Sequence, residues 1–402
     1  MSNPEPPILL LEREPRLKAI LDQEYPRFSD GEYAERRARL AAVMAGAGCD
    51  HVLAVTANRS GNATQWITGW PGTAEALVIL KPGEPLTMFM EWHNHFPLAK
   101  KIARDNDERW GEHRALELTI AELKRRGAKR VGLIGPLAMA KFRRLEQNFQ
   151  VVGLDAEYVK LRLIKSEQEL DWLRIGAALS DAGFAALLSG TRPGLTEREL
   201  SDLVERAYVP YGGMTMIHYI GVTAMANPHI FVPPQHPSPR AVAAGDVVFC
   251  ELSAFWWDYP GQVLRTFTVG ADPTPLYRDL HATAEAAFDA VTAVVRHGTT
   301  MQEIVDAAGV IEANGYTVCD DLMHGFGGGY FPPILGTKSR PAGELPNMIL
   351  EENMTVVVQP NVVTRDEPGT IKAGVQVGEM IRVTKNGFER LHRTPRRFFR
   401  AS

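Results

Sequence analysis

One segment of the sequence has the outline of a site for hydrolytic chemistry. Glu251 to Gly270, ELSAFWWDYPGQVLRTFTVG, is typical of a strand, a turn and a second strand. A hydrolytic metal site in such a frame needs carboxylates at two positions that face one point. The first position is Glu251, but the second, Gln262, carries no charge. The segment therefore keeps the frame of a metal-binding hairpin and lacks one of its anionic ligands.

Four further stretches place polar groups beside or within apolar strands, where such groups cost free energy unless they are used or hydrogen bonded. These stretches are ANPHIFVPPQHP, MHGFGGGYFPP, VVVQPNVV and VQVGEMIRVT. Their polar residues are, in chain order, His229, His236, His324, Gln359, Glu379 and Arg382. Together with the hairpin, they form a set of groups suited to proton transfer and to substrate binding.

Each stretch also has an ordinary structural interpretation. A single histidine is usually structural or exposed, and we assign no role to His236. Glu379 and Arg382 can form an ion pair on the face of a strand. The glycines at 327–329 do not match a phosphate-binding loop, which lies between a strand and a helix. The chemical interpretation therefore depends on all the stretches occurring together, in one order and at specific spacings.

The elements that must position these groups predict two domains. Short apolar strands alternate with amphipathic helices over about the first 155 residues, which is typical of an α/β domain. A capping box at Ser166 then opens a long helix, and strand-like runs dominate after Met214. Helices grouped around an antiparallel sheet make this second part α+β. We expect one domain over residues 1–160 and a second over residues 161–402.

The composition excludes several classes of protein. The chain has 402 residues, of which 45% are hydrophobic, and a net charge of −4. No basic block indicates nucleic acid as a partner, and no apolar run reaches the length of a membrane span. Three widely spaced cysteines argue against a disulfide scaffold and favour a cytoplasmic location.

The order and spacing of these motifs resemble the pita-bread family of methionine aminopeptidases, Xaa-Pro peptidases and creatinase. The landmarks lie between Leu161 and Leu391: RLIKSEQELDWLR, GDVVFCELSAFWWDYPGQVLRTFTVG, HGFGGG, NMTVVVQP and GEMIRVTKNG. The N-terminal stretch ATQWITGWPGTAEALVIL resembles the smaller domain of creatinase and prolidase relatives. The resemblance implies a pita-bread catalytic domain after a smaller α/β domain. It also implies a homodimer in which the small domain of one chain covers the other's pocket.

The metal-dependent members of that family hold two divalent ions with two Asp, one His and two Glu residues. The matching residues here are, in that order, Glu251, Gln262, His324, Gln359 and Gly378. Two divalent ions close together need carboxylates that bridge and neutralise them, whereas an amide brings no charge and glycine no side chain. A lone Glu with a His is also too few ligands for a catalytic zinc ion, which usually has three. We therefore expect no metal ion and no other cofactor.

The polar pocket that remains favours hydrolysis of a C–N bond in a small molecule of the amidine, amide or ureido type. Creatinase implies a catalytic histidine at the position of His229, because a neutral imidazole can take a proton from water and return it to a leaving nitrogen. The candidate catalytic residues are His229, Glu251, His324 and Glu379. The candidate substrate-binding residues are Gln262, Gln359, Arg340 as a carboxylate clamp, and Trp257 and Tyr330 as aromatic walls.

Creatine itself is not the expected substrate. Leu264 and Gln359 stand where creatinase has the glutamates that grip the guanidinium group. Three other functions stay open for this scaffold. They are an eliminating lyase or dehydratase, an Xaa-Pro-type aminopeptidase with one metal ion at Glu251, His324 and Glu379, and a non-catalytic binding protein.

Overall fold

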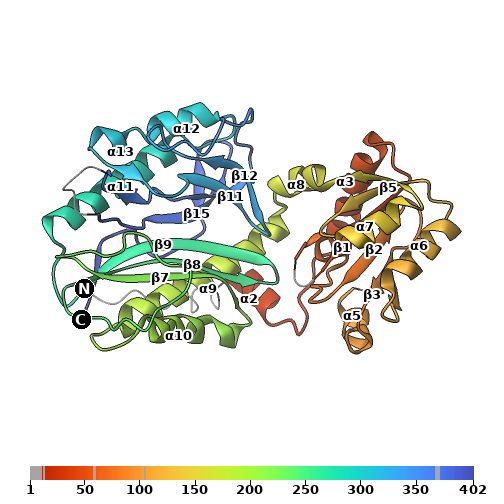
Figure 1. The fold of residues 1–402 in the computed structure, drawn as a ribbon, viewed down its shortest axis with the longest axis horizontal. Coiled ribbons are helices and arrows are strands. Elements are labelled where there is room, and N and C mark those ends of the chain that lie inside the picture. Colours follow the sequence, from red (N-terminus) through yellow and green to blue (C-terminus); the bar gives the residue numbers. More distant parts are fainter. Residues whose placement is uncertain (1–10, 12–13, 58–59, 104–105, 367–371) are drawn as a thin grey trace. The chain divides into compact units, whose positions relative to one another are not determined.

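The chain forms two compact units, which a computed structural model describes over residues 11, 14–57, 60–103, 106–366 and 372–402 (Figure 1). The first unit spans residues 22–162. The second comprises residues 163–402 together with helix α2 (Pro15–Leu21), which precedes the first unit in the chain.

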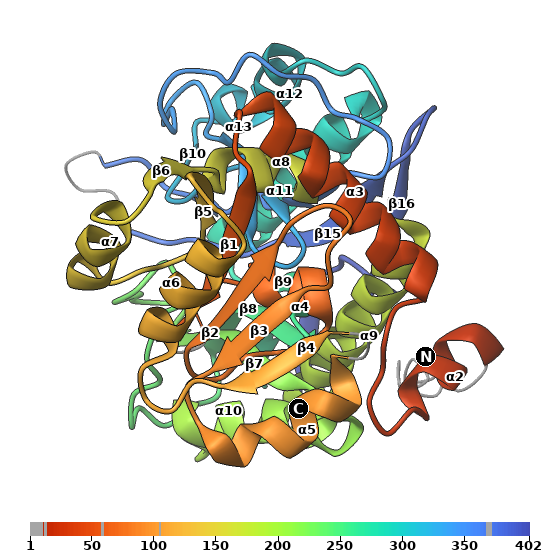
Figure 2. The same cartoon turned by 90° about the vertical axis from the view of Figure 1, so that its right-hand side faces the viewer.

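The first unit contains a six-stranded sheet in the order β4-β3-β2-β1-β5-β6 (Figure 2). Its strands are β1 (His51–Thr56), β2 (Ala76–Leu80), β3 (Thr87–Met90), β4 (Asp107–Trp110), β5 (Arg130–Ile134) and β6 (Gln150–Gly153). Its helices are α3 (Asp30–Gly46), α4 (Ala63–Thr68), η1 (His93–His95), α5 (Phe96–Ile102), α6 (Ala115–Arg125), α7 (Met139–Glu146) and α8 (Asp155–Leu163). The apolar residues Leu116, Ile120 and Leu123 repeat at helical spacing, so α6 can bury one face against this sheet.

The second unit is built on a nine-stranded sheet in which β12-β11-β13-β15-β9-β8-β7 are neighbours, β16 pairs with β15, and β17 pairs with β9. The strands are β7 (Met214–Ala224), β8 (Asp246–Trp256), β9 (Tyr259–Val269), β11 (Met323–Phe326), β12 (Tyr330–Leu335), β13 (Thr355–Val358), β15 (Gly378–Val383), β16 (Phe388–Arg390) and β17 (Phe399–Ala401). Two short strands, β10 (Thr317–Val318) and β14 (Val362–Val363), pair with each other.

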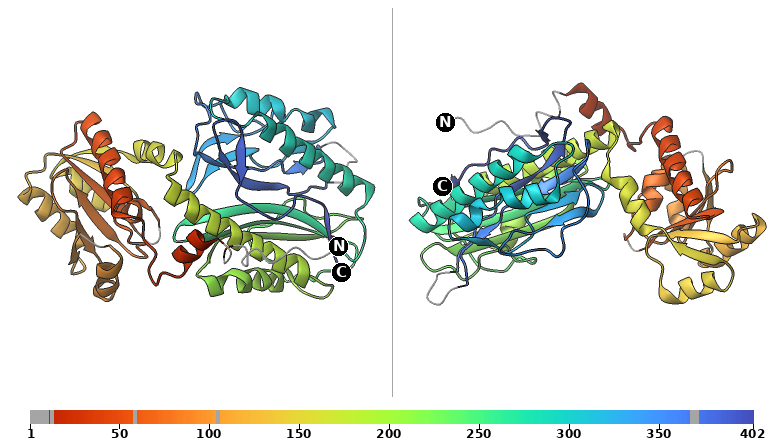
Figure 3. Two further views of the ribbon diagram at one scale, coloured as in Figure 1. Left: turned by 180° about the vertical axis from the view of Figure 1, so that it is seen from behind. Right: turned by 90° about the horizontal axis from the view of Figure 1, so that it is seen from above.

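The helices of this unit are α9 (Glu167–Gly190), α10 (Glu197–Tyr208), η2 (Val209–Tyr211), α11 (Pro275–Val294), α12 (Met301–Ala307) and α13 (Val310–Ala313) (Figure 3). The capping box predicted at Ser166 is confirmed, because the Ser166 side chain accepts the backbone N–H of Glu169 and the Glu169 carboxylate accepts the backbone N–H of Ser166. The helices α9 and α10 precede the long hairpin β8–β9, and Ser180 of α9 donates to the carbonyl of Gly261 in β9 at 2.6 Å.

A buried polar network joins helix α9 to the C-terminal segment. Asp181 and His392 are both fully buried, and Oδ1 of Asp181 lies 2.9 Å from Nδ1 of His392. The other carboxylate oxygen accepts the backbone N–H groups of Arg393 and Thr394. Burial alone would raise the pKa of Asp181, but the charge and hydrogen bond of His392 and these N–H groups outweigh it. The pKa of Asp181 therefore lies below its ordinary value.

We expect this network to stabilise the fold at neutral pH and to lose its contribution in acid. Because the pKa of Asp181 is lowered in the folded state, the unfolded chain binds the proton first as the pH falls. The contribution is present above the ordinary Asp pKa of about 4 and disappears as the pH falls toward the folded value. Urea unfolding between about pH 7 and pH 3 should show a smaller acid loss of stability for Asp181→Asn than for the unaltered chain.

The matched control for this prediction is Asp202→Asn, because Asp202 is exposed and pairs with Arg206 at the surface. Its dependence of unfolding free energy on pH should follow that of the unaltered chain, since exposed ion pairs contribute little. Equal losses of unfolding free energy in acid for the unaltered chain and both variants would contradict the role assigned to Asp181.

Candidate functional site

The register of the large sheet brings four of the five matching positions to one face. Residues opposite each other in neighbouring strands project from the same face. Leu264 of β9 lies opposite both Glu251 of β8 and Gly378 of β15, and the register continues through β13 to His324 of β11. Gln262 lies two residues from Leu264 and so shares this face. Glu251, Gln262, His324 and Gly378 therefore surround one region of the sheet.

Two glutamine amides link carboxyl groups on this face. The amide nitrogen of Gln262 donates to Oε1 of Glu251 at 2.5 Å and lies 3.5 Å from Oε1 of Gln359. The amide nitrogen of Gln359 donates to the backbone carbonyl of Asp321 at 3.3 Å and to its Oδ1 at 3.1 Å. The backbone N–H of Asp321 donates to Oδ1 of Asp320 at 2.9 Å. We call these five residues the amide–carboxyl chain.

Two carboxyl groups of this chain, those of Glu251 and Asp321, have raised pKa values. Burial, followed by the charges of Asp320 and Asp321, raises the pKa of Glu251 to about 8, against the opposing effect of the hydrogen bond from Gln262. Burial and the nearby Asp320 also raise the pKa of Asp321. At neutral pH the Glu251 side chain is therefore mainly a carboxylic acid, which can donate a proton as well as accept a hydrogen bond.

His324 is held as a neutral, buried imidazole. It is 1% exposed, and its ring stacks on that of Tyr330 with centroids 4.1 Å apart and planes 20° apart. Its Nδ1 lies 3.3 Å from the carbonyl of Gly325. Burial lowers the pKa of His324 to about 4, so the ring carries no charge near neutral pH. Tyr330 thus adjoins the site through this stacking contact.

His229 is anchored on the same face but further along the sheet. It is exposed in the loop after β7, where its backbone N–H and its Nδ1 each lie 2.9 Å from the hydroxyl oxygen of Thr223. Thr223 lies opposite Val247, four residues along β8 from Glu251, which corresponds to roughly 13 Å. A substrate between these points of the sheet would therefore face both the imidazole and the amide–carboxyl chain.

Glu379 projects from the opposite face. It lies opposite Val263, the neighbour of Leu264, and it is fully buried. Its carboxylate accepts from Arg265 at 2.6 Å and from both Nε and Nη2 of Arg390. The structure therefore does not bring Glu379 together with Glu251, although the two residues belong to neighbouring parts of one sheet.

Arg382, Trp257 and Arg340 lie outside the amide–carboxyl chain. Arg382 pairs with Glu389 and Glu167 rather than with Glu379. Trp257 forms the tip of the β8–β9 hairpin, with φ of +50°, and Arg340 lies in the loop that follows β12. Neither Trp257 nor Arg340 belongs to the chain of contacts around Glu251.

Sequence reasoning did not find Asp320 and Asp321. They lie outside the five matching positions, directly before the strand that carries His324. The available signal was the pair of adjacent acidic residues three and four positions before a histidine in an apolar run. Two adjacent carboxyl groups at such a strand entrance indicate a functional site, because neighbouring like charges shift each other's pKa values.

The residues on this face do not fit a two-ion metal centre. A Cβ atom at Gly378 would lie 2.6 Å from the carbonyl oxygen of Val358 and 2.8 Å from Cα of Gln359, so backbone fills the space of the missing ligand. Gln262 and Gln359 supply uncharged amides. Across the described residues, no group of three or more His, Cys, Asp or Glu side chains is arranged to hold a metal ion.

Gly378→Ala should destabilise the second unit by about 1–3 kcal/mol, because the added methyl group meets backbone that cannot rotate away. Urea unfolding measures this change. Gly387→Ala is the matched control, since nothing lies within 4 Å of its Cβ position, and its effect should stay within about 0.5 kcal/mol. Equal stability of the two variants would contradict the close approach at Gly378.

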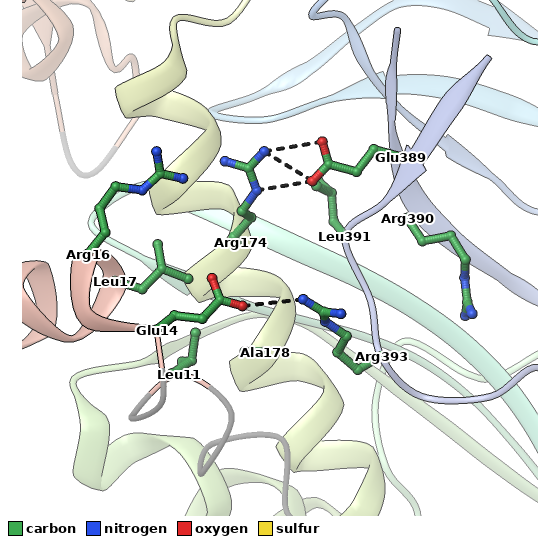
Figure 4. A pocket seen from close by; sticks show the side chains of 10 residues that line it. All are labelled: Leu11, Glu14, Arg16, Leu17, Arg174, Ala178, Glu389, Arg390, Leu391 and Arg393. Carbon is green, nitrogen blue, oxygen red and sulfur yellow. Dashed lines mark hydrogen bonds and ion pairs between the residues drawn. The ribbon is translucent and has the colours of Figure 1, made fainter. Parts of the chain in front are cut away.

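A separate cavity of about 270 Å³ lies beside α2, α9 and β16 (Figure 4). Two ion pairs line it, Arg174 with Glu389 and Arg393 with Glu14. The other basic residues of its wall also have acidic partners: Arg16 pairs with Asp171, and Arg390 pairs with Glu379. These pairs compensate its charges, so the site on the sheet is the better candidate for chemistry.

Residues 171–385, more than half of the chain, match the model of metallopeptidase family M24. The chain belongs to metallopeptidase family M24. The predicted pita-bread family and α+β fold are thereby confirmed, as is the prediction of a hydrolase that acts on C–N bonds. The metal-ligand mismatch described above is thus a departure within a family of metallopeptidases.

Known relatives of this M24 chain agree with the family assignment. An uncharacterized peptidase of Staphylococcus aureus is 26% identical over 264 residues, which cover 63% of this chain and 70% of the relative. An Xaa-Pro dipeptidase from Bacillus anthracis superposes with a TM-score of 0.78 at 21% identity, covering 92% of this chain and 99% of the other. A prolidase from Pyrococcus horikoshii gives 0.76 at 21% identity, covering 90% and 99%. At such identities the solved structures establish the fold alone.

Within the described parts of this M24 chain, none of the helices combines the length and apolar character needed to cross a membrane.

Proposed function

We propose that this chain hydrolyses a C–N bond of a small molecule without a metal ion, in the manner of creatinase. The observation that carries the proposal is the residue set at the five ligand positions. Two are amides, one is a glycine whose missing side chain is replaced by backbone, and the remaining acid, Glu251, has a pKa raised to about 8. Such a site lacks the negative charge that two divalent ions require.

In this proposal His229 moves the protons. When Nδ1–H donates to the hydroxyl of Thr223, Nε2 keeps its lone pair and can take a proton from water. The same nitrogen then returns the proton to the leaving nitrogen of the substrate. The contact with Thr223 fixes the direction of the ring, which is why we assign this histidine and not His236.

The amide–carboxyl chain binds and polarises the substrate in the same proposal. Neutral Glu251 can donate a hydrogen bond to the substrate carbonyl, and Gln262 fixes its orientation. Gln359 and neutral His324 provide further hydrogen-bonding groups. Glu379 acts as a positioning residue, since it braces Arg265, which in turn donates to the carbonyl of Gly378 at 2.6 Å.

The substrate-binding roles of the remaining candidate residues are proposed from their positions alone. Arg340 would clamp a substrate carboxylate, and Trp257 and Tyr330 would supply aromatic surfaces. We further propose a cytoplasmic homodimer, in which the segment from Glu91 to Phe96 contributes to the rim of the partner's pocket. Cross-linking and analytical ultracentrifugation of the purified chain would test the dimer.

The test is turnover by purified protein after dialysis against a chelator. The panel should contain amides, amidines, ureido acids and Xaa-Pro dipeptides, in water labelled with heavy oxygen. We expect turnover that chelator leaves unchanged and product that contains one labelled oxygen per C–N bond broken. Product without label would favour an eliminating lyase, and activity that appears only with added Mn²⁺, Co²⁺ or Zn²⁺ would refute the metal-independent mechanism.

A second candidate is a peptidase with a reduced metal site. It is favoured by the family match and by solved neighbours that are Xaa-Pro dipeptidases and prolidases. It predicts turnover confined to the Xaa-Pro dipeptides of the panel, together with one tightly held metal ion in elemental analysis. Binding without turnover of any compound would instead favour a non-catalytic binding protein.

A further inference from the structure

Three carboxyl groups of the amide–carboxyl chain lie close together without a basic partner. Gln262 and Gln359 join Glu251 to Asp321, and Asp320 adjoins Asp321 through a backbone hydrogen bond of 2.9 Å. In the part of the chain that the structure describes, no lysine or arginine forms an ion pair with any of these carboxyl groups. No basic side chain among the described residues therefore pairs with these carboxyl groups when they are ionised.

Several polar atoms around these carboxyl groups also lack hydrogen-bond partners among the described residues. Oε1 of Gln262 is one of them, in a side chain that is 1% exposed and whose nitrogen already contacts Glu251. Oδ2 of Asp321 is another, and so is Oδ1 of the fully buried Asn361, two residues after Gln359. Each of these atoms is an acceptor, and a buried acceptor left open costs about 1–3 kcal/mol. Such groups are normally satisfied by water or by a ligand.

We propose that Glu251, Asp320 and Asp321 form a subsite for a small organic cation that carries N–H donors, of the protonated amine or amidine class. The carboxyl groups supply the opposite charge in their ionised forms, which a bound cation favours, and the open oxygens of Gln262 and Asp321 match N–H donors. A quaternary ammonium ion has no N–H group to satisfy these acceptors. Asp320 and Asp321 lie outside the five ligand positions, whereas Glu251 is one of them, so the subsite adjoins the place of the missing metal centre.

The subsite would bind the charged part of the substrate of the proposed function. It rests on the proposed function in one respect only, the identification of the bound cation as the substrate. Hydrolysis of an amidine or of an amide next to a protonated amine would place the charged nitrogen at Asp320 and Asp321. The bond to be broken would then face Glu251. The binding itself is independent of turnover and can be measured alone.

The experiment is a nuclear magnetic resonance titration of the full chain, dialysed against a chelator, with acetamidine, its neutral isostere acetamide, and tetramethylammonium. We expect acetamidine to bind at least about tenfold more tightly than either of the others. Asp320→Asn combined with Asp321→Asn should reduce the affinity for acetamidine by about tenfold or more, and leave that for acetamide unchanged. Thermal unfolding checks that the double variant is folded.

The matched control is Glu351→Gln combined with Glu352→Gln, which removes two negative charges from an exposed turn. This variant should keep the affinity of the unaltered chain for acetamidine. If the aspartate double variant does not fold, Asp320→Asn alone, at an exposed position, should still weaken acetamidine binding by about threefold.

Equal affinity for acetamidine and acetamide would overturn the subsite, as would aspartate variants that bind acetamidine like the control. Tight binding of tetramethylammonium would overturn the assignment of an N–H cation. A chain that binds acetamidine through Asp320 and Asp321 but hydrolyses nothing in the panel refutes the proposed function and leaves the subsite. A chain that hydrolyses a compound of the panel but does not bind acetamidine through Asp320 and Asp321 refutes the subsite and leaves the proposed function.

Discussion

Arg265→Met is expected to destabilise the second unit by about 3–5 kcal/mol, which is the largest effect on stability that we predict. The Arg265 side chain is fully buried. It donates to Glu379 at 2.6 Å and to the carbonyls of Gly378 at 2.6 Å, Thr394 at 2.8 Å and Pro395 at 3.0 Å. Methionine fills a similar volume but removes the donor from the carbonyls of Gly378 and Pro395 and leaves the Glu379 charge compensated by Arg390 alone. Urea unfolding at neutral pH measures the loss.

Two further variants separate the charge effect from simple packing. Arg390→Met removes the other partner of Glu379, but its side chain is 38% exposed, so water can replace it and the loss should be smaller. Arg265→Met combined with Glu379→Met removes the uncompensated buried charge and should recover part of the stability lost in the single variant. A loss below about 1 kcal/mol for Arg265→Met would contradict this account of the network.

His229→Ala should lower kcat on the substrate found in the panel by about 10²- to 10⁴-fold, the usual contribution of a general acid–base group. The reason is that no other imidazole on this face is both exposed and anchored among the described residues, since His324 is buried and stacked on Tyr330. Steady-state kinetics with the chelator-treated protein measures the effect. The fold should be unchanged, because His229 is exposed.

The controls for this prediction come from the same loop and the same contact. His236→Ala should keep full activity, because His236 is also exposed in that loop and receives no role. Thr223→Val removes the hydroxyl that orients the ring at 2.9 Å and should cause an intermediate loss in kcat. Full activity of His229→Ala would assign the proton transfer to another group, with Glu251 the first candidate.

The sequence allowed the fold to be predicted, and its strand pattern placed several candidate residues on one face of the sheet. Period-two strands around Glu251, Gln262 and His324 place these residues on one face. Motif spacing alone did not place Glu379. A shift of one residue along a strand moves a side chain to the other face, and only the pairing of Glu379 with Val263 identifies that face.

The carboxyl pair could not be found by comparison with the ligand motif. Asp320 and Asp321 belong to an irregular segment before β11, and their proximity to Glu251 depends on long-range contacts through Gln359. The sequence also did not reveal the ion pair between Glu379 and Arg390, because Arg390 lies on a strand whose register follows from the turn at 384–387. Turn geometry and side-chain contacts of this kind are set by tertiary packing.

The close approach of backbone at Gly378 has a consequence for the history of this site. Carboxylates can return to positions 262 and 359 by exchange of side chains alone, but a side chain at 378 first requires β13 and β15 to separate. Carboxylates at 262 and 359 would therefore still leave the position at 378 without a ligand.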